Sequence, residues 1–292
     1  MKILLAIQNF LIGFFQTASS LFKILVGSGF FIKPSIKHCD NNCIILGNGP
    51  SLDQSIGEHQ ASFDKYHLIC VNHFAESTIY GTIKPTIYVL NAPEMWMDDV
   101  EPYHYEKGEK LFNTISTNTN WDIDLFIPYS AKKFRRWQEK ISKNPQIRIR
   151  FFNSTPTEGY TWFRYFCYKN YLGLPRPHNV LIPSLMLALY LNYKTIYLFG
   201  TDHSWMRDMW VTEDNEVLLN QKHFYDKNIS KGRPMDYLGK GSRKMHEILQ
   251  KFVYAFSGYV EINEYSKTRG QEIINCTEGS YIDAFIKSKE IE

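Results

Sequence analysis

The sequence has little net charge and little sign of a non-globular chain. Lys and Arg total 33 and Asp and Glu total 30 among 292 residues, so the net charge is only +3. This balance gives no support to a nucleic-acid partner, which would favour a strongly basic surface. Hydrophobic residues make up 44% of the chain, which is more than a disordered protein carries. The composition therefore predicts a globular protein long enough to bury a core.

Paired cysteines are also missing. The five cysteines are odd in number and widely scattered, at positions 39, 43, 70, 167 and 276. Neither a disulfide framework nor a zinc site with two C-x-x-C pairs fits this spacing, and Cys39 with Cys43 would supply half of a metal site at most. We therefore expect reduced thiols in a cytoplasmic setting.

Charge is almost absent from residues 3–31, where Lys23 is the single ionised side chain. The stretch lacks a clean small-residue cleavage site, so we do not expect a cleavable signal peptide. At 100° per residue its apolar side chains fall on one helical face, and the polar ones (Gln8, Asn9, Gln16, Ser19, Ser20 and Lys23) fall on the other. A helix immersed in lipid needs no polar face, whereas a helix lying in the headgroup plane does.

The charges before the first acidic residue point the same way. Four lysines (Lys2, Lys23, Lys33 and Lys37) precede Asp40, which suits an anionic cytoplasmic leaflet. We therefore expect residues 1–38 to form an amphipathic helix that binds the cytoplasmic face of a membrane through residues 3–31. A membrane-spanning helix and a helix packed on the protein's own core stay open as alternatives. The catalytic domain is then expected over residues 39–288.

Four short apolar runs predict parallel strands that are buried on both faces. They cover residues 43–46, 67–71, 86–90 and 195–199. Small or polar residues follow each run, and ligands of open α/β sheets bind beyond the carboxyl ends of the strands. We therefore expect one polar crevice, suited to a base, a ribose and a phosphate, formed by Asn48, Asn72, Asn91 and Asp202.

The first of these strand ends, Gly47-Asn48-Gly49, lacks the third glycine of the G-x-G-x-x-G pattern. We expect its backbone to approach a phosphate closely, with an ordinary tight turn as the alternative. Apolar patterns predict helices over residues 180–192 and 241–256. Residues 205–240 are polar, aromatic and aperiodic, which is typical of a lid.

Several segments, taken in order, resemble a known family. "IILGNGPSL", "CVNHF", "VLNAP", "LALYLNYKTIYLFGTDHSW" and "INCTEGSYIDAF" are similar to segments of the family-42 bacterial sialyltransferases. They are also similar to a broader group of surface-polysaccharide and flagellin-modifying proteins that includes relatives of an archaeal 6-hydroxymethylpterin diphosphokinase. The resemblance covers roughly residues 43–285.

This resemblance implies a Rossmann-like α/β/α sandwich with a mostly parallel sheet and a small lid, acting on a CMP-activated sugar acid without a metal or other cofactor. It implies that Asn48 and Ser51 touch the donor phosphate and ribose. It further implies that Asn72 and Asn91 contact the nucleotide, and that Gly200, Thr201 and Asp202 hold the cytidine.

The sequence departs from the family at the catalytic histidine. The family has Y-x-G-H after the lid, whereas this chain has Tyr237-Leu238-Gly239-Lys240. A general base must take the proton of the acceptor hydroxyl, and histidine suits neutral pH. We predict His223 as that base, with His203 as the alternative. The candidates for stabilising the leaving phosphate are Tyr225, Tyr237, Lys240 and Arg243.

Two charged segments are expected to be solvated surface and not functional sites. Asp122-Ile123-Asp124 has the D-x-D form of a metal site, but it precedes an apolar strand instead of following one, so we expect a solvated turn. The basic stretch that begins at Lys132 and continues to Arg150 is expected to be a solvated helix face, with contact to anionic lipid or to a phosphorylated acceptor as the alternative.

Together these features predict a membrane-associated glycosyltransferase. It would move a sugar, such as a sialic or ulosonic acid from a CMP donor, onto a glycan or glycolipid precursor of lipopolysaccharide or capsule. A pyrophosphokinase-like phosphotransferase and a non-catalytic nucleotide-sugar-binding protein are the alternatives. Whether the chain forms a homo-oligomer is left open.

Overall fold

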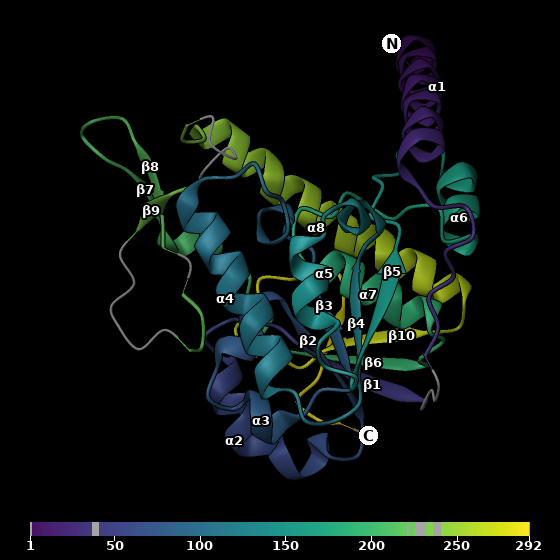
Figure 1. Ribbon diagram of the computed structural model, residues 1–292. Helices are drawn as coiled ribbons and strands as arrows, with labels where there is room; N and C mark the ends of the chain where they lie inside the picture. The colour runs from purple at the N-terminus through teal and green to yellow at the C-terminus, as the bar shows by residue number, and fades with distance from the viewer. Residues whose placement is uncertain (1, 37–40, 221, 226–231, 236–240, 292) are drawn as a thin grey trace.

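An eight-stranded parallel sheet forms the centre of the protein (Figure 1). The computed structural model describes residues 2–36, 41–220, 222–225, 232–235 and 241–291. The strand order is β11-β10-β6-β1-β2-β3-β4-β5. The strands are β1 (Asn42–Leu46), β2 (His67–Val71), β3 (Ile87–Val89), β4 (Ile123–Pro128), β5 (Ile147–Phe152), β6 (Thr195–Phe199), β10 (Glu272–Asn275) and β11 (Ile286–Lys287).

The apolar runs form strands because both faces of the sheet are covered. In β1, Cys43 and Ile45 pack toward one core, whereas Ile44 and Leu46 pack toward the other. Side chains alternate between the faces of a strand, so a strand covered on both sides needs an apolar residue at every position. All four strands that the sequence predicts are present.

Helices cover the two faces of the sheet. One layer contains α2 (Leu52–Phe63), α3 (Tyr80–Ile83), α4 (Pro102–Asn118) and α5 (Arg136–Ile141). The other contains α6 (Thr161–Lys169), α7 (Leu181–Tyr190) and α8 (Met245–Thr268). Helix α8 is longer than predicted because its buried stripe continues through Tyr259, Ile262 and Tyr265. The prediction of a Rossmann-like α/β/α fold is confirmed.

The chain reverses its direction across the sheet between β1 and β6. The first five strands run outward from β1 to β5, and the chain then returns to place β6 on the other side of β1. Such a switch point leaves a crevice at the carboxyl ends of the two central strands, because their following loops diverge. The fold therefore brings residues 47–51 and 200–203 to one place.

The predicted lid region contains a small sheet and is not one long loop. Residues 205–235 include η4 (Trp205–Asp208) and three antiparallel strands, β7 (Met209–Val211), β8 (Val217–Leu219) and β9 (Arg233–Pro234). Val217 and Leu219 are buried against Ile248 and Phe252 of α8. The apolar positions were too few in each short strand to give a recognisable period in the sequence.

Helix α1 (Lys2–Gly27) lies outside both helix layers (Figure 1). Its buried residues are Gly13, Ser20 and Ile24, and its apolar side chains are mostly exposed. By length and composition it is the one described helix that is able to cross a membrane, with a mean hydropathy of 1.5 over an 18-residue window of which 17% is buried. The predicted boundary at residue 38 lies outside the described residues.

The expectation of a solvated turn at the D-x-D segment is wrong for its second aspartate. Asp124 lies within β4 and is only 2% exposed. Its carboxylate accepts hydrogen bonds from Arg148 at 3.2 Å and from Arg150 at 2.9 Å. Both arginines lie on the neighbouring strand β5, so Asp124 links β4 to β5. It does so at the amino end of β4, away from the switch-point crevice.

The basic stretch is solvated only in part: Lys132, Lys133 and Arg135 are exposed, whereas other residues of the stretch are buried or paired with acids. Trp137 is buried, and Arg136 contacts Glu109 at 3.1 Å and Asp98 at 3.3 Å. Lys140 also contacts Glu109, at 2.8 Å. Acidic partners from α4 and the loop before it therefore offset much of the positive charge.

Candidate functional site

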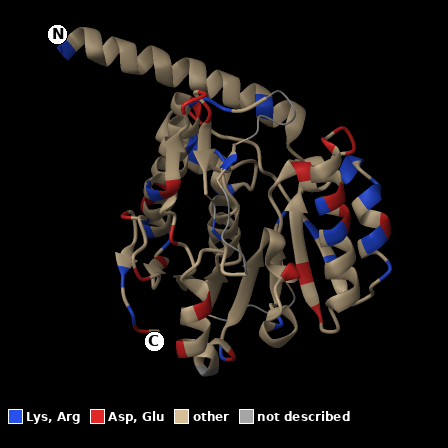
Figure 2. Ribbon diagram, turned by 90° about the vertical axis from the view of Figure 1, so that its left-hand side faces the viewer, with Lys and Arg blue, Asp and Glu red and all other residues tan. Residues whose placement is uncertain are grey.

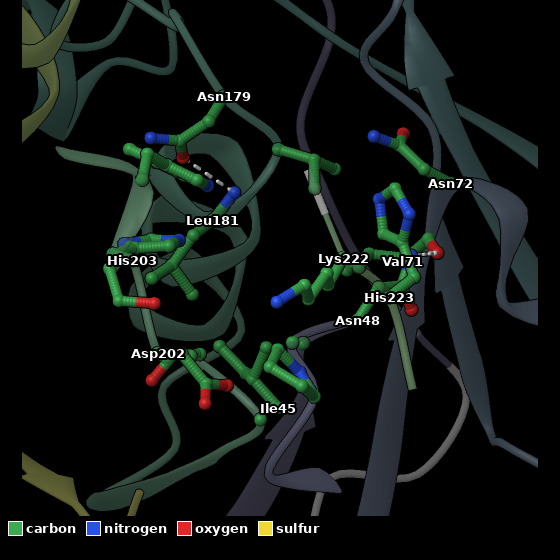
Figure 3. A pocket seen from close by; sticks show the side chains of 18 of the residues that line it. Ile45, Asn48, Val71, Asn72, Asn179, Leu181, Asp202, His203, Lys222 and His223 are labelled. Atoms are coloured by element: carbon green, nitrogen blue, oxygen red, sulfur yellow. Dashed lines mark hydrogen bonds between the residues drawn. The ribbon is translucent and has the colours of Figure 1, made fainter. Parts of the chain in front are cut away.

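A cavity of about 230 Å³ lies at the switch point (Figure 3). Residues from four parts of the chain surround it: the loop after β1, the end of β2, the start of α7 and the segment that follows β6. The lining includes Gly47, Asn48, Gly49, Asn72, Asn179, Gly200, Thr201, Asp202, His203, Trp205, Asp208, Asn220, Lys222 and His223. Most of the predicted site residues therefore meet around one hollow.

The glycines of the first loop are required by contact between two backbones. Gly47 N–H donates to Phe199 O and Gly49 N–H donates to Gly200 O, each at 2.8 Å. A Cβ on Gly47 would lie 2.3 Å from Gly200 O, and Gly200 itself has φ +64°. These two N–H groups are therefore already bonded within the protein, so the predicted approach of this loop to a phosphate could not use them.

Asp202 joins the two loops at the beginning of α2. Its carboxylate accepts the Ser51 hydroxyl at 2.9 Å and the Ser51 N–H at 3.3 Å. A helix N-terminus attracts anions, so this carboxylate fills the place where a Rossmann fold commonly binds phosphate. Burial raises the pKa of Asp202, and the hydrogen bonds from Ser51 oppose that rise. Ser51 is thereby directed to Asp202 and does not line the cavity.

Of the three predicted asparagines, two line the cavity and one supports it. Asn48 donates from Nδ2 to Val71 O at 3.1 Å, and its buried Oδ1 has no hydrogen-bond partner among the described residues. Asn72, at φ +46°, accepts the Asn91 N–H at 3.2 Å through its side-chain oxygen. Asn91 itself turns away and donates to Pro177 O at 3.1 Å. The prediction that Asn91 lines the crevice is therefore wrong.

His203 lies deep in the wall of the cavity and is held in one protonation state. Asn179 Nδ2 donates to the Tyr259 hydroxyl at 2.6 Å, and this hydroxyl forms a hydrogen bond with His203 Nδ1 at 3.1 Å. Burial lowers the pKa of His203 to about 3. The ring is therefore neutral at pH 7, with one nitrogen as donor and the other as acceptor. His203 is thus poorly suited to be a general base.

Lys222 and His223 form the opposite wall (Figure 3). Figure 3 shows the Lys222 side chain extending toward the side that carries His203 and Asp202. Its Nζ lies 3.8 Å from Asp208. The His223 ring stacks on Tyr225, with centroids 5.2 Å apart and planes at 2°. Tyr225 contacts His223 by this stacking and does not itself line the cavity.

Two other predicted site residues, Tyr237 and Lys240, lie outside the described residues. Arg243 is described but lies outside the cavity lining.

The wall with Lys222 and His223 is fixed to the first loop. Phe224 N–H donates to Asn48 O at 3.2 Å, and the Phe224 ring packs on Phe74 with centroids 5.4 Å apart. Asn220 N–H donates to Asp208 O at 2.8 Å. The base of the predicted lid therefore forms part of the cavity.

Sequence reasoning missed the contribution of the start of α7. Asn179 Oδ1 accepts the N–H groups of Leu181 and Ile182, so it caps this helix, while its Nδ2 donates to Tyr259. A helix that precedes a strand begins at the carboxyl edge of a parallel sheet, and Asn is a favoured capping residue. An asparagine directly before the predicted helix could therefore have indicated that the start of this helix lies at the cavity.

The comparisons with known proteins support the fold. No family model matches the chain, and no curated protein matches it. Among solved structures it is similar to a MAf glycosyltransferase from Magnetospirillum magneticum AMB-1, with a TM-score of 0.50 and 13% sequence identity. The chain shares its fold with a glycosyltransferase. The match covers 95% of this chain and 38% of that one, so the chain spans well under half of the neighbour's length.

Replacing Gly49 tests whether the two loops need backbone contact. A Cβ there would lie 1.9 Å from Asp202 Oδ2 and 2.7 Å from Gly200 O. We expect Gly49→Ala to lower the free energy of unfolding by about 1–3 kcal/mol in denaturant titrations, as overpacking does. The matched control is Gly57→Ala in α2, which faces open space. It should stabilise the protein by about 0.5–1 kcal/mol, and equal effects of the two substitutions would contradict the interpretation.

The buried state of His203 predicts a stability that falls in acid. Its pKa is about 3 in the folded protein and about 6.5 when unfolded, so protons bind the unfolded state better. The neutral His203 ring makes its full contribution to the free energy of unfolding above pH 6.5. As the pH falls below that value, up to about 1.4 kcal/mol of this free energy is lost per pH unit.

The variant His203→Asn should remove that part of the pH dependence, because asparagine tolerates the φ of +50° at this position. Unfolding free energies at pH 7 and pH 5.5 measure the change, and His246→Asn at an exposed position of α8 is the control. A slope that is the same in His203→Asn as in the unchanged protein would refute the assignment.

Proposed function

We propose that the protein is a glycosyltransferase that uses a nucleotide-activated sugar. The proposed donor is a CMP-activated sialic or ulosonic acid, and the proposed acceptor is a cell-surface glycan or glycolipid precursor. The observation that carries the proposal is the cavity at the switch point between β1 and β6, lined by amides, one lysine and histidines. A fold shared with a glycosyltransferase supports the same class.

The polar groups of the cavity suit a nucleoside. The buried Asn48 Oδ1, which lacks a partner among the described residues, offers an acceptor to a base amino group or a ribose hydroxyl. The neutral His203 ring lines the other side of the cavity, where its Nε2 offers a further polar contact. The cavity volume of about 230 Å³ lies below the ~300–1,000 Å³ of common small-molecule sites, which favours one mononucleotide over a dinucleotide.

The phosphate of the donor would meet Lys222. Asp202 already fills the N-terminus of α2, so the usual phosphate position of a Rossmann fold is taken. Lys222 is the one lysine or arginine among the described residues that line the cavity. Its ammonium group would stabilise the charge that develops on the leaving phosphate as the bond to the anomeric carbon breaks.

His223 is the proposed general base. In the transfer step the acceptor oxygen forms a bond to the anomeric carbon, the bond from that carbon to the phosphate oxygen breaks, and the acceptor proton passes to the imidazole. His223 lines the cavity on the same wall as Lys222, and its ring is oriented by stacking on Tyr225. His203 is less suited to this role, because burial lowers its pKa and makes it a weaker base.

Membrane association is part of the proposal. Helix α1 carries a long exposed apolar surface, and its lysines would favour the anionic cytoplasmic leaflet of a bacterial inner membrane. An enzyme held there would meet a lipid-linked acceptor without releasing it from the bilayer.

The decisive experiment is a ligand screen followed by a transfer assay. Binding to the folded state raises the melting temperature, so CMP should stabilise the protein more than UDP, GDP or ATP do. With a CMP-activated sialic acid as donor, His223→Ala should retain the CMP shift and lose at least ~100-fold in turnover. Unchanged turnover in that variant would remove His223 from the mechanism. A preference for ATP with strict Mg²⁺ dependence would replace the proposal with a phosphotransferase, and CMP binding without turnover would indicate a binding protein.

Lys222 gives a second, independent prediction. Lys222→Gln should weaken CMP binding about ten-fold, or about 1.4 kcal/mol, while binding of cytidine should stay unchanged because cytidine lacks the phosphate. Isothermal calorimetry with both ligands measures the difference, and Lys143→Gln at an exposed position is the control. Equal weakening of CMP and cytidine would show that Lys222 acts by shaping the cavity and not through its charge.

A further inference from the structure

A continuous apolar surface covers α1 and the neighbouring face of α6. Thirteen large apolar side chains of α1 are exposed, namely Ile3, Leu4, Leu5, Ile7, Phe10, Leu11, Ile12, Phe14, Phe15, Leu21, Phe22, Leu25 and Val26. On α6, Trp162 is 68% exposed and Phe166 is 56% exposed, one turn apart. An exposed apolar area of this kind marks an interaction site.

The two helices meet through Tyr160. Its ring lies 6.1 Å from that of Phe10 and stacks on Trp162 at 6.4 Å and 15°. Its hydroxyl donates to Phe10 O at 2.8 Å. Trp162 is therefore placed beside the apolar face of α1, although about 150 residues separate them in the sequence.

Helix α1 is held to the body by a stripe of small residues. Thr17 Oγ1 accepts the Tyr160 N–H at 3.1 Å, and Ser20 Oγ accepts the Glu158 N–H at 2.8 Å. A Cβ on Gly13 would lie 2.6 Å from the Tyr160 ring, and one on Gly159 would lie 2.1 Å from Thr17 Oγ1. Gly13, Thr17 and Ser20 thus face the protein together with Ile24, whereas most of the other side chains of α1, apolar and polar, are exposed.

This attachment sets the orientation of α1. The contacts run from Phe10 to Ile24, so only residues 2–9 extend beyond them, a length of about 12 Å at ~1.5 Å per residue. Crossing a hydrocarbon core needs ~30 Å. Insertion of the whole helix would also pull Glu158 and its partner Arg176, at 2.6 Å, into the hydrocarbon. Figure 2 shows α1 lying along the top of the molecule, almost without charged residues.

The charges indicate what covers this surface. Residues 1–39 contain four lysines and no acidic residue, so this part of the chain is positively charged, although Lys23 lies 3.9 Å from Glu158. An anionic lipid surface is complementary to both the lysines and the apolar side chains. Exposed Trp and Phe beside such a helix suit the boundary between headgroups and hydrocarbon.

We propose that α1 lies in the plane of an anionic bilayer without spanning it, and that Trp162 and Phe166 of α6 are part of the same membrane-binding surface. This inference extends the proposed membrane association and is independent of the donor chemistry. Its failure would leave nucleotide binding at the cavity untouched.

The test uses the full chain with vesicles of phosphatidylethanolamine and phosphatidylglycerol. Trp162→Ser with Phe166→Ser should lower the partition into vesicles by ten-fold or more, because two large apolar side chains lose their lipid contact. The double change Trp162→Phe with Phe166→Leu, which keeps the side chains apolar, should restore binding. Trp210→Ser on β7, where the tryptophan is 44% exposed, is the matched control and should bind as the unchanged protein does. Circular dichroism and a melting temperature measured without vesicles verify that each variant is folded.

Labelling distinguishes an in-plane helix from a spanning one. With protein added to sealed vesicles, the Lys2→Cys variant should react with a membrane-impermeant maleimide from outside, relative to the unchanged protein. Protection of the introduced thiol until the vesicles are lysed would overturn the in-plane orientation. Unaltered partition of the double serine variant would remove α6 from the surface, and dimers without vesicle binding would assign the surface to a second copy.

Discussion

The contact between the Asp202 carboxylate and the start of α2 holds the site together. It bonds both the hydroxyl and the N–H of Ser51, and it does so only because Gly49 has no side chain in the way. A carboxylate at a helix N-terminus is favourable, so the protein uses one of its own anions where related folds use a ligand. This contact joins the loop that follows β1 to the segment that follows β6, and both line the cavity.

The sheet was largely accessible from the sequence, and the reason is physical. A strand covered on both faces needs an unbroken apolar run, as residues 195–199 show, and the parallel order then brings the strand ends to one edge. The burial of Asp124 in β4 was harder to predict. Its carboxylate is paired with two arginines that lie some 24–26 positions further along the chain. No local pattern identifies a partner at that separation.

The site could be predicted in outline only. Strand ends placed Asn48, Asn72 and Asp202 at one cavity, because topology alone brings them together. Which way each polar group points depends on its competitors: Asn91 bonds Pro177 O, and the N–H groups of Gly47 and Gly49 bond the loop after β6. Lys222 was missed because the short strands before it gave no period from which to place it.

The bond from Phe224 N–H to Asn48 O has a consequence for access to the cavity. It ties the wall bearing Lys222 and His223 to the residue whose Oδ1 has no partner among the described residues, and the Phe224 ring packs on Phe74 beside this bond. A shift of this wall as a ligand enters would therefore move the Asn48 backbone as well.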